Sequence, residues 1–535
     1  MNWLVKAVNT AFTKSRRKER PVERGEAQLS DRAWAVASAL VLIIAAAFRL
    51  VALELRPMHH DEGVNAGYFL LNLVRRGSYT YDPANYHGPT LYYFALVPVK
   101  LFGLHTWTVR LTTALFGIAA VWLLLFLRRR IGAYGALAAA ILLALSPGAT
   151  FLARYFIHET PFVFFSLGAL VAFLHYLETA KERYLYLAAA SLALFFATKE
   201  TAFITVSVMS IAATLAVAWT RSGKRRAMKR SDEMTFIERV GGTPALISHA
   251  LVAVLIFLSV DIIFYSSFFT NPKGVGDAVA SLSFWTKTGR TDHVKPFATY
   301  FWWTLAEEAP LLILGAIGAA LALLRANNRF AIFAAFWAWG TFFAYSLIPY
   351  KTPWLMLNFI VPLTVVAGYA ANELAAAHKS GRPWLIHASL AVIAAFSAYQ
   401  SALLNFVHYD DENYPYVYVH TQRDFLRLVN EIEELSARIG TGPRTRIAVL
   451  SPDYWPLPWY LRDFAHVNYY AKVVQTDDQL VIASVEEREA VQALLGSGYS
   501  SVGLFTLRPG VELELYVRRE PKPLAAGYEE RIRRR

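Results

Sequence analysis

The chain has 535 residues and a net charge of +13, and 56% of its residues are hydrophobic while only 17% are charged. Soluble domains are about 45–50% apolar and about 25% charged, so this composition excludes soluble, disordered and fibrous proteins and indicates a membrane protein. The sequence contains no cysteine. Disulfides, thiolate metal sites and a cysteine nucleophile are therefore excluded, and any chemistry must rest on carboxylates, His, Lys and Arg.

The first 32 residues carry the basic run KSRRKERPVER (14–24). No apolar segment with a small-residue cleavage site follows a short basic start, so this segment does not have the form of a signal peptide. Positive charge next to a first membrane span favours the cytoplasmic side. We therefore predict that residues 1–32 are a retained cytoplasmic tail.

Residues 33–410 contain apolar segments long enough to cross about 30 Å of hydrocarbon. We count about eleven predicted transmembrane helices, at 33–53, 106–127, 133–152, 160–177, 184–198, 201–219, 243–269, 300–324, 330–350, 354–377 and 382–406. The stretch 88–103 is apolar but short and contains two prolines. We interpret it as an interfacial or re-entrant helix, and the amphipathic segment 64–74 as a second interfacial helix in the same loop.

An alternating path from a cytoplasmic N-terminus places every strongly basic loop on the cytoplasmic side, as the positive-inside rule requires. These loops are 128–130, 181–183, 221–230, 325–329 and 378–382. The acidic and histidine-containing loops then face outward. Residues 411–535 carry more charge and alternate β-type runs such as 446–450 and 501–517 with helical stretches. They predict a small extracytoplasmic α/β domain.

Two adjacent acids, Asp61 and Glu62, follow the first span directly and are preceded by His59 and His60. An acid at the border of lipid and water can act on a substrate held there. A solvated loop is the alternative. The two histidines leave a divalent metal open, although neighbouring side chains diverge on either regular backbone, whereas metal ligands must converge.

Further charged residues lie where two apolar spans meet, at Arg154, His158 and Glu159 and again at Lys199 and Glu200. An isolated charge at mid-membrane depth costs roughly 2.5–3.5 kcal/mol, so these groups need partners. They either pair with one another, lie at the headgroup level or line a polar cavity.

Arg110 begins the span 106–127 on the predicted outer side, where an anionic partner such as a lipid phosphate or simple snorkelling would account for it. Two more sets of polar residues have equally open interpretations. Glu307 and Glu308 either lie inside an apolar helix or mark its beginning, and Lys351 lies in the tight turn 350–354.

The order of HHDEG (59–63), NYHGPTLYYFA (85–95) and VRLTTALFG (109–117) resembles the polytopic glycosyltransferases of the GT-C fold. The likeness is to the branch that contains protein O-mannosyltransferases and the aminoarabinose transferase of lipid A. A closer resemblance is to the membrane family of flippase-activity-associated glycosylation proteins of archaea and bacteria. It rests on ARYFIHETPFVFF (153–165), ATKETAFI (197–204), PYKTPWL (349–355), YVYVHTQRD (416–424) and DYWPLPWYLRD (453–463).

The resemblance implies a sugar donor on a polyprenyl phosphate and a role for each matched residue. Asp61 matches the general base and Glu62 its partner, Glu159 stands where many relatives carry an aspartate, and Arg110 matches an arginine near the lipid phosphate. Our own inference adds Lys199, Arg154 and Lys351 as phosphate-binding residues. It also adds supporting roles for four residues: His60, His87, His158 and Glu200.

The sequence thus predicts an all-α polytopic membrane glycosyltransferase in the cell membrane, with a catalytic domain at 33–410 and an outer α/β domain at 411–535. It would transfer a sugar to an acceptor on the extracytoplasmic face with inversion, the acceptor being a protein, lipid or polysaccharide, and without nucleic acid. No cofactor is required by this mechanism, and a divalent metal is left open. A lipid-linked saccharide flippase or transporter and a non-catalytic accessory protein of a glycosylation pathway are the alternatives.

Overall fold

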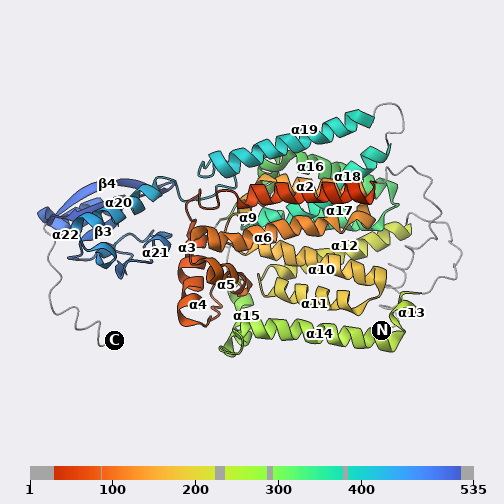
Figure 1. Ribbon diagram of the computed structural model, residues 1–535, viewed down its shortest axis with the longest axis horizontal. Coiled ribbons are helices and arrows are strands. Elements are labelled where there is room, and N and C mark those ends of the chain that lie inside the picture. Colours follow the sequence, from red (N-terminus) through yellow and green to blue (C-terminus); the bar gives the residue numbers. More distant parts are fainter. Residues whose placement is uncertain (1–28, 86, 223–234, 286–292, 378–382, 520–535) are drawn as a thin grey trace. The chain divides into compact units, whose positions relative to one another are not determined.

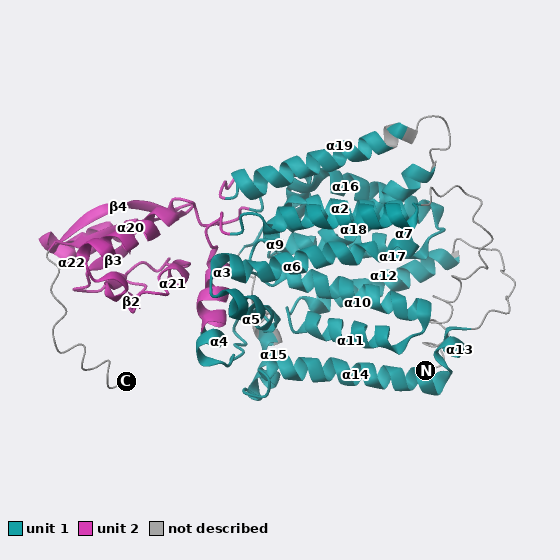
Figure 2. Ribbon diagram, viewed as in Figure 1, with its two compact units in different colours: residues 1–53, 72–409, 414–416 teal, residues 54–71, 410–413, 417–535 magenta. Residues whose placement is uncertain are grey.

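The computed structural model describes residues 29–85, 87–222, 235–285, 293–377 and 383–519. The chain forms two compact units, shown in different colours in Figure 2. Unit 1 is made of residues 1–53, 72–409 and 414–416, and unit 2 of residues 54–71, 410–413 and 417–535. Residues 1–28 of the predicted tail 1–32 lie outside the described residues, and helix α2 (Asp31–Leu50) begins within the predicted tail. The basic loop 378–382 and most of the basic loop 221–230 also lie outside the described residues.

Unit 1 is helical, and Figure 1 shows its long helices lying side by side. The helices of unit 1, long and short, are α2 (Asp31–Leu50), α5 (Thr90–Phe102), α6 (Thr106–Leu125), α7 (Arg128–Ile131), α8 (Ala133–Leu145), α9 (Pro147–Ala153), α10 (Glu159–Thr179), α11 (Glu182–Phe196), α12 (Ala202–Ser222), α13 (Phe236–Val240), α14 (Thr243–Tyr265), α15 (Lys273–Trp285), α16 (Thr299–Arg325), α17 (Arg329–Leu347), α18 (Leu357–Ala377) and α19 (Pro383–Ala402). A helix α4 (Leu71–Arg76) joins the two units in sequence.

Each of the eleven predicted spans is helical. Within the described ranges, nine helices are long and apolar enough to cross a membrane, and α8 with α9 makes a tenth if this pair, bent by 61°, counts as one span. Helix α11 has 15 residues, fewer than the roughly 20 that a span requires. The predicted short helix at 88–103 is confirmed as α5, whose 13 residues reach about 20 Å and are too short to cross.

Small residues let the central helices of unit 1 approach closely. Helix α18 is almost entirely buried, whereas in α14 Ala253 alone is buried. A Cβ atom on Gly368 of α18 would lie 2.3 Å from the carbonyl oxygen of Gly135 in α8, and one on Gly318 of α16 would lie 2.1 Å from that of Val366. The backbones of α8, α16 and α18 therefore pack against one another at positions where any larger residue would force them apart.

A break between α8 and α9 and a kink in α16 meet at one buried carboxylate. Ser146 ends α8 and caps α9, and the first residue of α9 is a proline, which suits a helix start. Glu308 has a non-helical backbone (φ −131°, ψ 28°), and it accepts hydrogen bonds from Ser146 Oγ (2.6 Å) and Gly148 N (2.9 Å). Glu307 and Glu308 therefore both lie within α16, which begins at Thr299, and at the kink where its second half starts.

The loops of unit 1 separate to two ends, as Figure 2 shows. Helices α7 and α13 lie at one end, while α5 and α15 lie at the other. Helix α7 contains three of the basic residues that the sequence predicts to be cytoplasmic. The predicted site residues Asp61, Glu62 and His87 precede α5 in the sequence, and those at 154–159 and 199–200 follow it.

Unit 2 contains a five-stranded sheet in the order β2-β1-β3-β5-β4. Its strands are β1 (Arg446–Val449), β2 (His466–Tyr469), β3 (Leu480–Ser484), β4 (Tyr499–Arg508) and β5 (Val511–Arg518), and its helices are α3 (His60–Val64), α20 (Phe425–Ile439), α21 (Leu457–Tyr460) and α22 (Arg488–Leu495). Strands β2, β1 and β3 are parallel, and β5 and β4 continue the sheet antiparallel. The predicted α/β character of this region is confirmed.

The sheet of unit 2 carries a core on each face because its strands alternate their side chains. Ile447 and Val449 of β1 face a core that includes α20, whereas Ala448 faces a smaller core that includes Val491 and Leu495 of α22. Residues 54–71 belong to the same unit. A Cβ atom on Gly63 would lie 2.7 Å from Pro456, and Met58 N donates to the hydroxyl of Tyr460 (2.9 Å), so this loop packs on the segment 455–460.

Candidate functional site

Five of the predicted site residues gather in unit 1. We refer to His87, His158, Glu159, Lys199 and Glu200 as the polar cluster; they come from the loop before α5, the start of α10 and the α11–α12 turn. The backbone of Gly88 joins the three segments, because its N–H donates to Thr198 O (3.1 Å) and its carbonyl accepts from His158 Nε2 (3.1 Å). A Cβ atom at this glycine would lie 2.0 Å from the carbonyl oxygen of Ala197, so only glycine permits this approach.

The charges of the polar cluster are paired inside it. Lys199 Nζ forms an ion pair with Glu159, and both side chains are 4% exposed. His87 Nδ1 lies 3.0 Å from Glu200 Oε2, and the rings of His87 and His158 are 4.9 Å apart. The sequence predicted that these groups need partners, and the structure assigns those partners within the cluster.

Burial and neighbouring charges set the protonation of the cluster. Burial, with help from His87 and Lys199, moves the pKa of His158 well below its ordinary value, so this ring is neutral at pH 7. Burial also opposes the charge of Lys199, but the carboxylates of Glu159 and Glu200 more than offset it and raise the pKa of the ammonium group. The site therefore holds one fixed cation between two carboxylates.

The predicted phosphate-binding arginines contact backbone carbonyls at the C-terminal end of α2. Arg110, which is fully buried, donates to Leu53 O (2.7 Å). Arg154 donates to Val51 O (2.5 Å) and Ala52 O (2.7 Å). These carbonyls lie in the turn that follows α2, which ends at Leu50, so both arginines hold that turn. Sequence reasoning missed another buried arginine, Arg49 of α2, which donates to Leu143 O and Ala144 O at the end of α8 (both 2.9 Å), although a charge in an apolar span is itself a signal.

Lys351 is buried in the turn after α17, where its Nζ donates to Ile348 O (2.6 Å). Burial lowers the pKa of this ammonium group. The backbone N–H of Lys351 donates to His293 O (3.0 Å), and Val294 pairs with Tyr350 in an antiparallel bridge. The turn is thus tied to residues 293–295, and the structure describes no contact between Lys351 and the polar cluster.

The adjacent acids Asp61 and Glu62 lie in unit 2 and have different surroundings. Glu62 is fully buried, and its carboxylate accepts from His59 N (3.1 Å), while His59 Nδ1 accepts from Asp61 N (3.1 Å). This reciprocal pair is a capping box that begins α3. The side chain of Asp61 is 40% exposed. Burial lowers the pKa of His60, whose ring lies 6.3 Å from Trp455.

Across the described parts of the chain, no group of three or more His, Asp or Glu side chains is arranged to hold a metal ion. Residues that the sequence did not single out lie beside the polar cluster. Tyr92 contacts the ring of His158 edge-on at 5.5 Å, and Thr90 and Thr198 share a hydrogen bond of 2.7 Å. Both Tyr92 and Thr90 fall in the segment 85–95 that carries the resemblance, which is the signal that would have found them.

Comparison with known proteins identifies the fold. Residues 86–233 match the family described as dolichyl-phosphate-mannose-protein mannosyltransferase, a range that contains all five residues of the polar cluster. No curated protein matches the sequence of the chain.

Two solved proteins resemble nearly the whole chain. ArnT from Cupriavidus metallidurans bound to undecaprenyl phosphate has a TM-score of 0.57 at 14% identity, covering 91% of this chain and 98% of that one. Its apo state has a TM-score of 0.59 at 16% identity, covering 90% and 98%. The Archaeoglobus fulgidus oligosaccharyltransferase tethered with an acceptor peptide containing the NVT sequon has a TM-score of 0.53 at 15% identity, covering 90% of this chain and 74% of that one.

The protein is therefore a multi-pass membrane protein with the fold of GT-C glycosyltransferases, as the resemblance implied. Within that fold it is similar to the branch of O-mannosyltransferases and ArnT. The closer resemblance to flippase-activity-associated glycosylation proteins stays a prediction.

Proposed function

We propose that the protein is an integral membrane glycosyltransferase that moves a sugar from a polyprenyl-phosphate donor to an acceptor on the extracytoplasmic face of the cell membrane. The GT-C fold supports the class of reaction, and the undecaprenyl phosphate bound to the similar ArnT supports the class of donor. The N-terminus would be cytoplasmic and residues 411–535 extracytoplasmic. The separation of the basic helix α7 from α5 in unit 1 supports this orientation.

Asp61 is the general base in this proposal, and one observation carries the choice. Of the two adjacent acids, Glu62 is fully buried and its carboxylate holds the start of α3, whereas the Asp61 side chain is 40% exposed. A base must come within hydrogen-bond reach of the proton that it abstracts. Asp61 can approach an acceptor, and Glu62 keeps the backbone that carries Asp61 in place.

The proposed reaction is a single displacement. Asp61 takes the proton from an acceptor hydroxyl, whose oxygen forms a bond to the anomeric carbon on the face opposite the phosphate. The bond from that carbon to the phosphate oxygen breaks, and the polyprenyl phosphate leaves with the electron pair, so the configuration inverts. General-base catalysis contributes about 10²–10⁴ in rate.

Lys199 is the proposed cation for the departing phosphate. An ammonium group has three donors, and the ion pair with Glu159 leaves others for a ligand. A fixed cation assists most where negative charge grows in the transition state. Arg110, Arg154 and Lys351 are further candidates for this role, and each also donates to a backbone carbonyl.

One observation favours the alternative of a lipid-linked saccharide flippase or transporter. Glu307 and Glu308 are buried inside α16, and Glu307 Oε1 has no hydrogen-bond partner among the described residues. Ionisable groups at membrane depth are typical of transport paths. A transporter would depend on these glutamates and tolerate the loss of Asp61.

The test compares Asp61→Asn with Glu62→Gln in cells whose own copy of the gene has been deleted. Glutamine keeps the capping box, so Glu62→Gln is a matched control that removes one neighbouring charge and preserves the helix start. We expect Asp61→Asn to abolish the glycan change that the parent restores, and Glu62→Gln to retain most of it. Native mass spectrometry should show polyprenyl phosphate on both variants. An active Asp61→Asn variant would refute the proposed base.

A further inference from the structure

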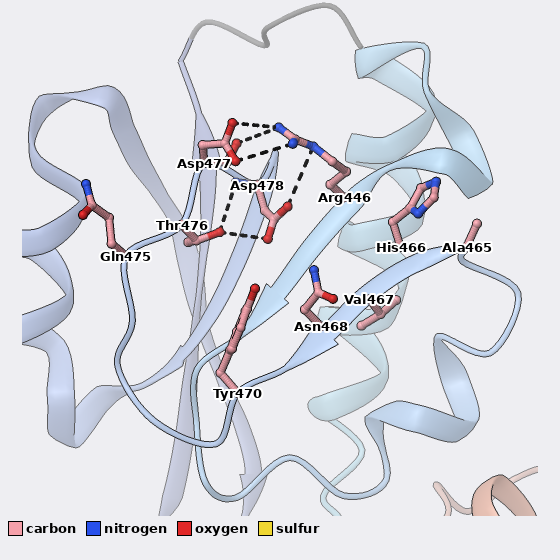
Figure 3. A pocket seen from close by; sticks show the side chains of 10 residues that line it. All are labelled: Arg446, Ala465, His466, Val467, Asn468, Tyr470, Gln475, Thr476, Asp477 and Asp478. Atoms are coloured by element: carbon pink, nitrogen blue, oxygen red, sulfur yellow. Dashed lines mark hydrogen bonds and ion pairs between the residues drawn. The ribbon is translucent and has the colours of Figure 1, made fainter. Parts of the chain in front are cut away.

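Unit 2 has an open polar recess with a volume of about 670 Å³, beside strands β1 and β2. Figure 3 shows its lining side chains, which come from Arg446, from Ala465 to Asn468, from Tyr470 and from the loop that leads to β3. Sites for small molecules have volumes of about 300–1,000 Å³. The recess is therefore large enough for a ligand of one or a few sugar rings.

The recess lies on one face of the sheet, at the edge strand β2. Side chains of a strand point alternately to the two faces, and polar side chains of β2 point to this face, where no described helix packs on the strand. Val467 and Tyr469 pack on the core that includes α20, so His466 and Asn468 point to the opposite face. The core on that face, with α22, includes Ala448 and Val481 but no residue of β2.

One wall of the recess is rigid and its charges are paired. Arg446 Nη2 donates to the carbonyl oxygen of Asp477 (2.9 Å) and lies 3.3 Å from its carboxylate, and Arg446 Nε lies 3.8 Å from Asp478. The hydroxyl of Thr476 donates to Asp478 (2.8 Å), and that of Tyr499 donates to the carbonyl oxygen of Asp478 (2.7 Å). The wall is thus preorganised, with no excess of positive charge.

The facing side chains have hydrogen-bonding capacity that the described chain does not use. Asn468 and Gln475 are exposed, and neither amide group makes a side-chain hydrogen bond within the described residues. Each amide offers two donors and one acceptor oxygen. Tyr470 is 40% exposed and adds an aromatic ring beside Asn468 (Figure 3).

We propose that this recess is a binding site for a neutral saccharide and that it holds part of the glycan acceptor. Sugar hydroxyls both donate and accept hydrogen bonds, which matches the amides of Asn468 and Gln475 and the carboxylates of Asp477 and Asp478. The ring of Tyr470 offers an apolar face to the C–H groups of a sugar. The recess and Asp61 belong to the same compact unit. The role as acceptor site, though not the binding itself, rests on the proposed transferase function.

Other ligands fit the lining less well. A phosphate or sulfate group needs unpaired cations, whereas Arg446 is already paired with two aspartates. A divalent cation needs converging ligands, and the described residues of the recess form no such group. A peptide could pair with the edge of β2 through its backbone, but it would not need the side chains of Asn468 and Tyr470.

The experiment uses the full-length protein in phospholipid nanodiscs and screens an array of neutral and acidic oligosaccharides, followed by titration of the best binder. The variants are Asn468→Ala and Tyr470→Ala, singly and together. Both sites are exposed, so each substitution should change stability by no more than about 0.5 kcal/mol. Glu433→Gln is the control, because Glu433 is exposed on α20, which packs on the opposite face of the sheet.

We expect the parent and Glu433→Gln to bind a neutral oligosaccharide equally, and the double variant to lose at least about tenfold in affinity, or 1.4 kcal/mol. Asp61→Asn should bind the saccharide like the parent. If Asp61→Asn binds the saccharide and still transfers sugar in cells, the proposed role of Asp61 in the transferase mechanism is refuted, while the saccharide site is supported. The inference is overturned if no neutral saccharide binds, if the double variant binds like the parent, or if only a peptide binds and is insensitive to both substitutions.

Discussion

The buried pair of Lys199 and Glu159 predicts a strong thermodynamic coupling. Both side chains are 4% exposed, so Lys199→Met leaves the Glu159 carboxylate buried without its cation. Breaking a buried ion pair in this way costs about 3–5 kcal/mol, and Lys199→Met should lower the unfolding free energy by that amount. Glu159→Gln should cost less, because Glu200 still stabilises the charge of Lys199.

The double variant should be more stable than Lys199→Met, because the Glu159 charge no longer remains buried alone. The measurement is the unfolding free energy in mixed micelles with increasing denaturing detergent, combined in a double-mutant cycle. Lys100→Met, at an exposed lysine of α5, is the control and should match the parent. Additive losses in the double variant would refute the coupling, and so would single variants as stable as the parent.

The double variant then separates folding from binding. A ligand present at 100 times its Kd stabilises the protein by about 2.7 kcal/mol. If Lys199 binds the donor phosphate, undecaprenyl phosphate should stabilise the parent and Lys100→Met but not the folded double variant. Equal stabilisation of all three would show that Lys199 serves the structure alone.

Two further predictions concern single positions. Gly88→Ala should lower the unfolding free energy by about 1–3 kcal/mol, because its Cβ would lie 2.0 Å from the carbonyl oxygen of Ala197. Gly276→Ala in α15 meets nothing within 4 Å and should raise the unfolding free energy by about 0.5–1 kcal/mol. Equal melting temperatures of the two variants would contradict this prediction. Burial lowers the pKa of His59 from 6.5 to about 4, so unit 2 should have its full stability above pH 6.5 and lose it as the pH falls toward 4. The melting temperature of the parent should fall as the pH falls across this range, and that of His59→Asn, which cannot titrate, should fall less. Parallel pH profiles of the two proteins would exclude His59 as the source of the pH dependence.

The helical architecture of unit 1 could be predicted because long apolar runs in the sequence indicate membrane helices. Apolar length alone placed a helix at each of the eleven predicted spans, although α11 is shorter than a span requires. The break between α8 and α9 was missed, although Ser146 and Pro147 are typical of a helix start. Inside an apolar run, such a start also needs a distant acceptor for its N–H groups. Glu308 is that acceptor, and no local pattern links a glutamate in α16 to a serine 162 positions away.

The partners of charged residues were predictable only in part, because carbonyl groups carry no sequence signal. Lys199 and Glu159 are both conspicuous in apolar surroundings, so a pairing among such charges could be anticipated. Arg110 and Arg154 were equally conspicuous, but they contact backbone oxygens in the turn after α2. Every residue has such an oxygen, and only the fold decides which ones lack a partner.

The pair Asp61 and Glu62 shows where local physics does separate two adjacent, chemically similar residues. A capping box requires an acid or amide at the third position of the helix, and three positions after His59 that residue is Glu62. The acid that the helix start uses is thereby buried, and its neighbour is left exposed. Because the constraint on Glu62 is a hydrogen bond and not a charge, glutamine can meet it, whereas a general base at Asp61 must be able to take up a proton. Replacing the acid by its amide should therefore be tolerated at Glu62 and should abolish transfer at Asp61. This difference distinguishes the structural role of Glu62 from the proposed catalytic role of Asp61.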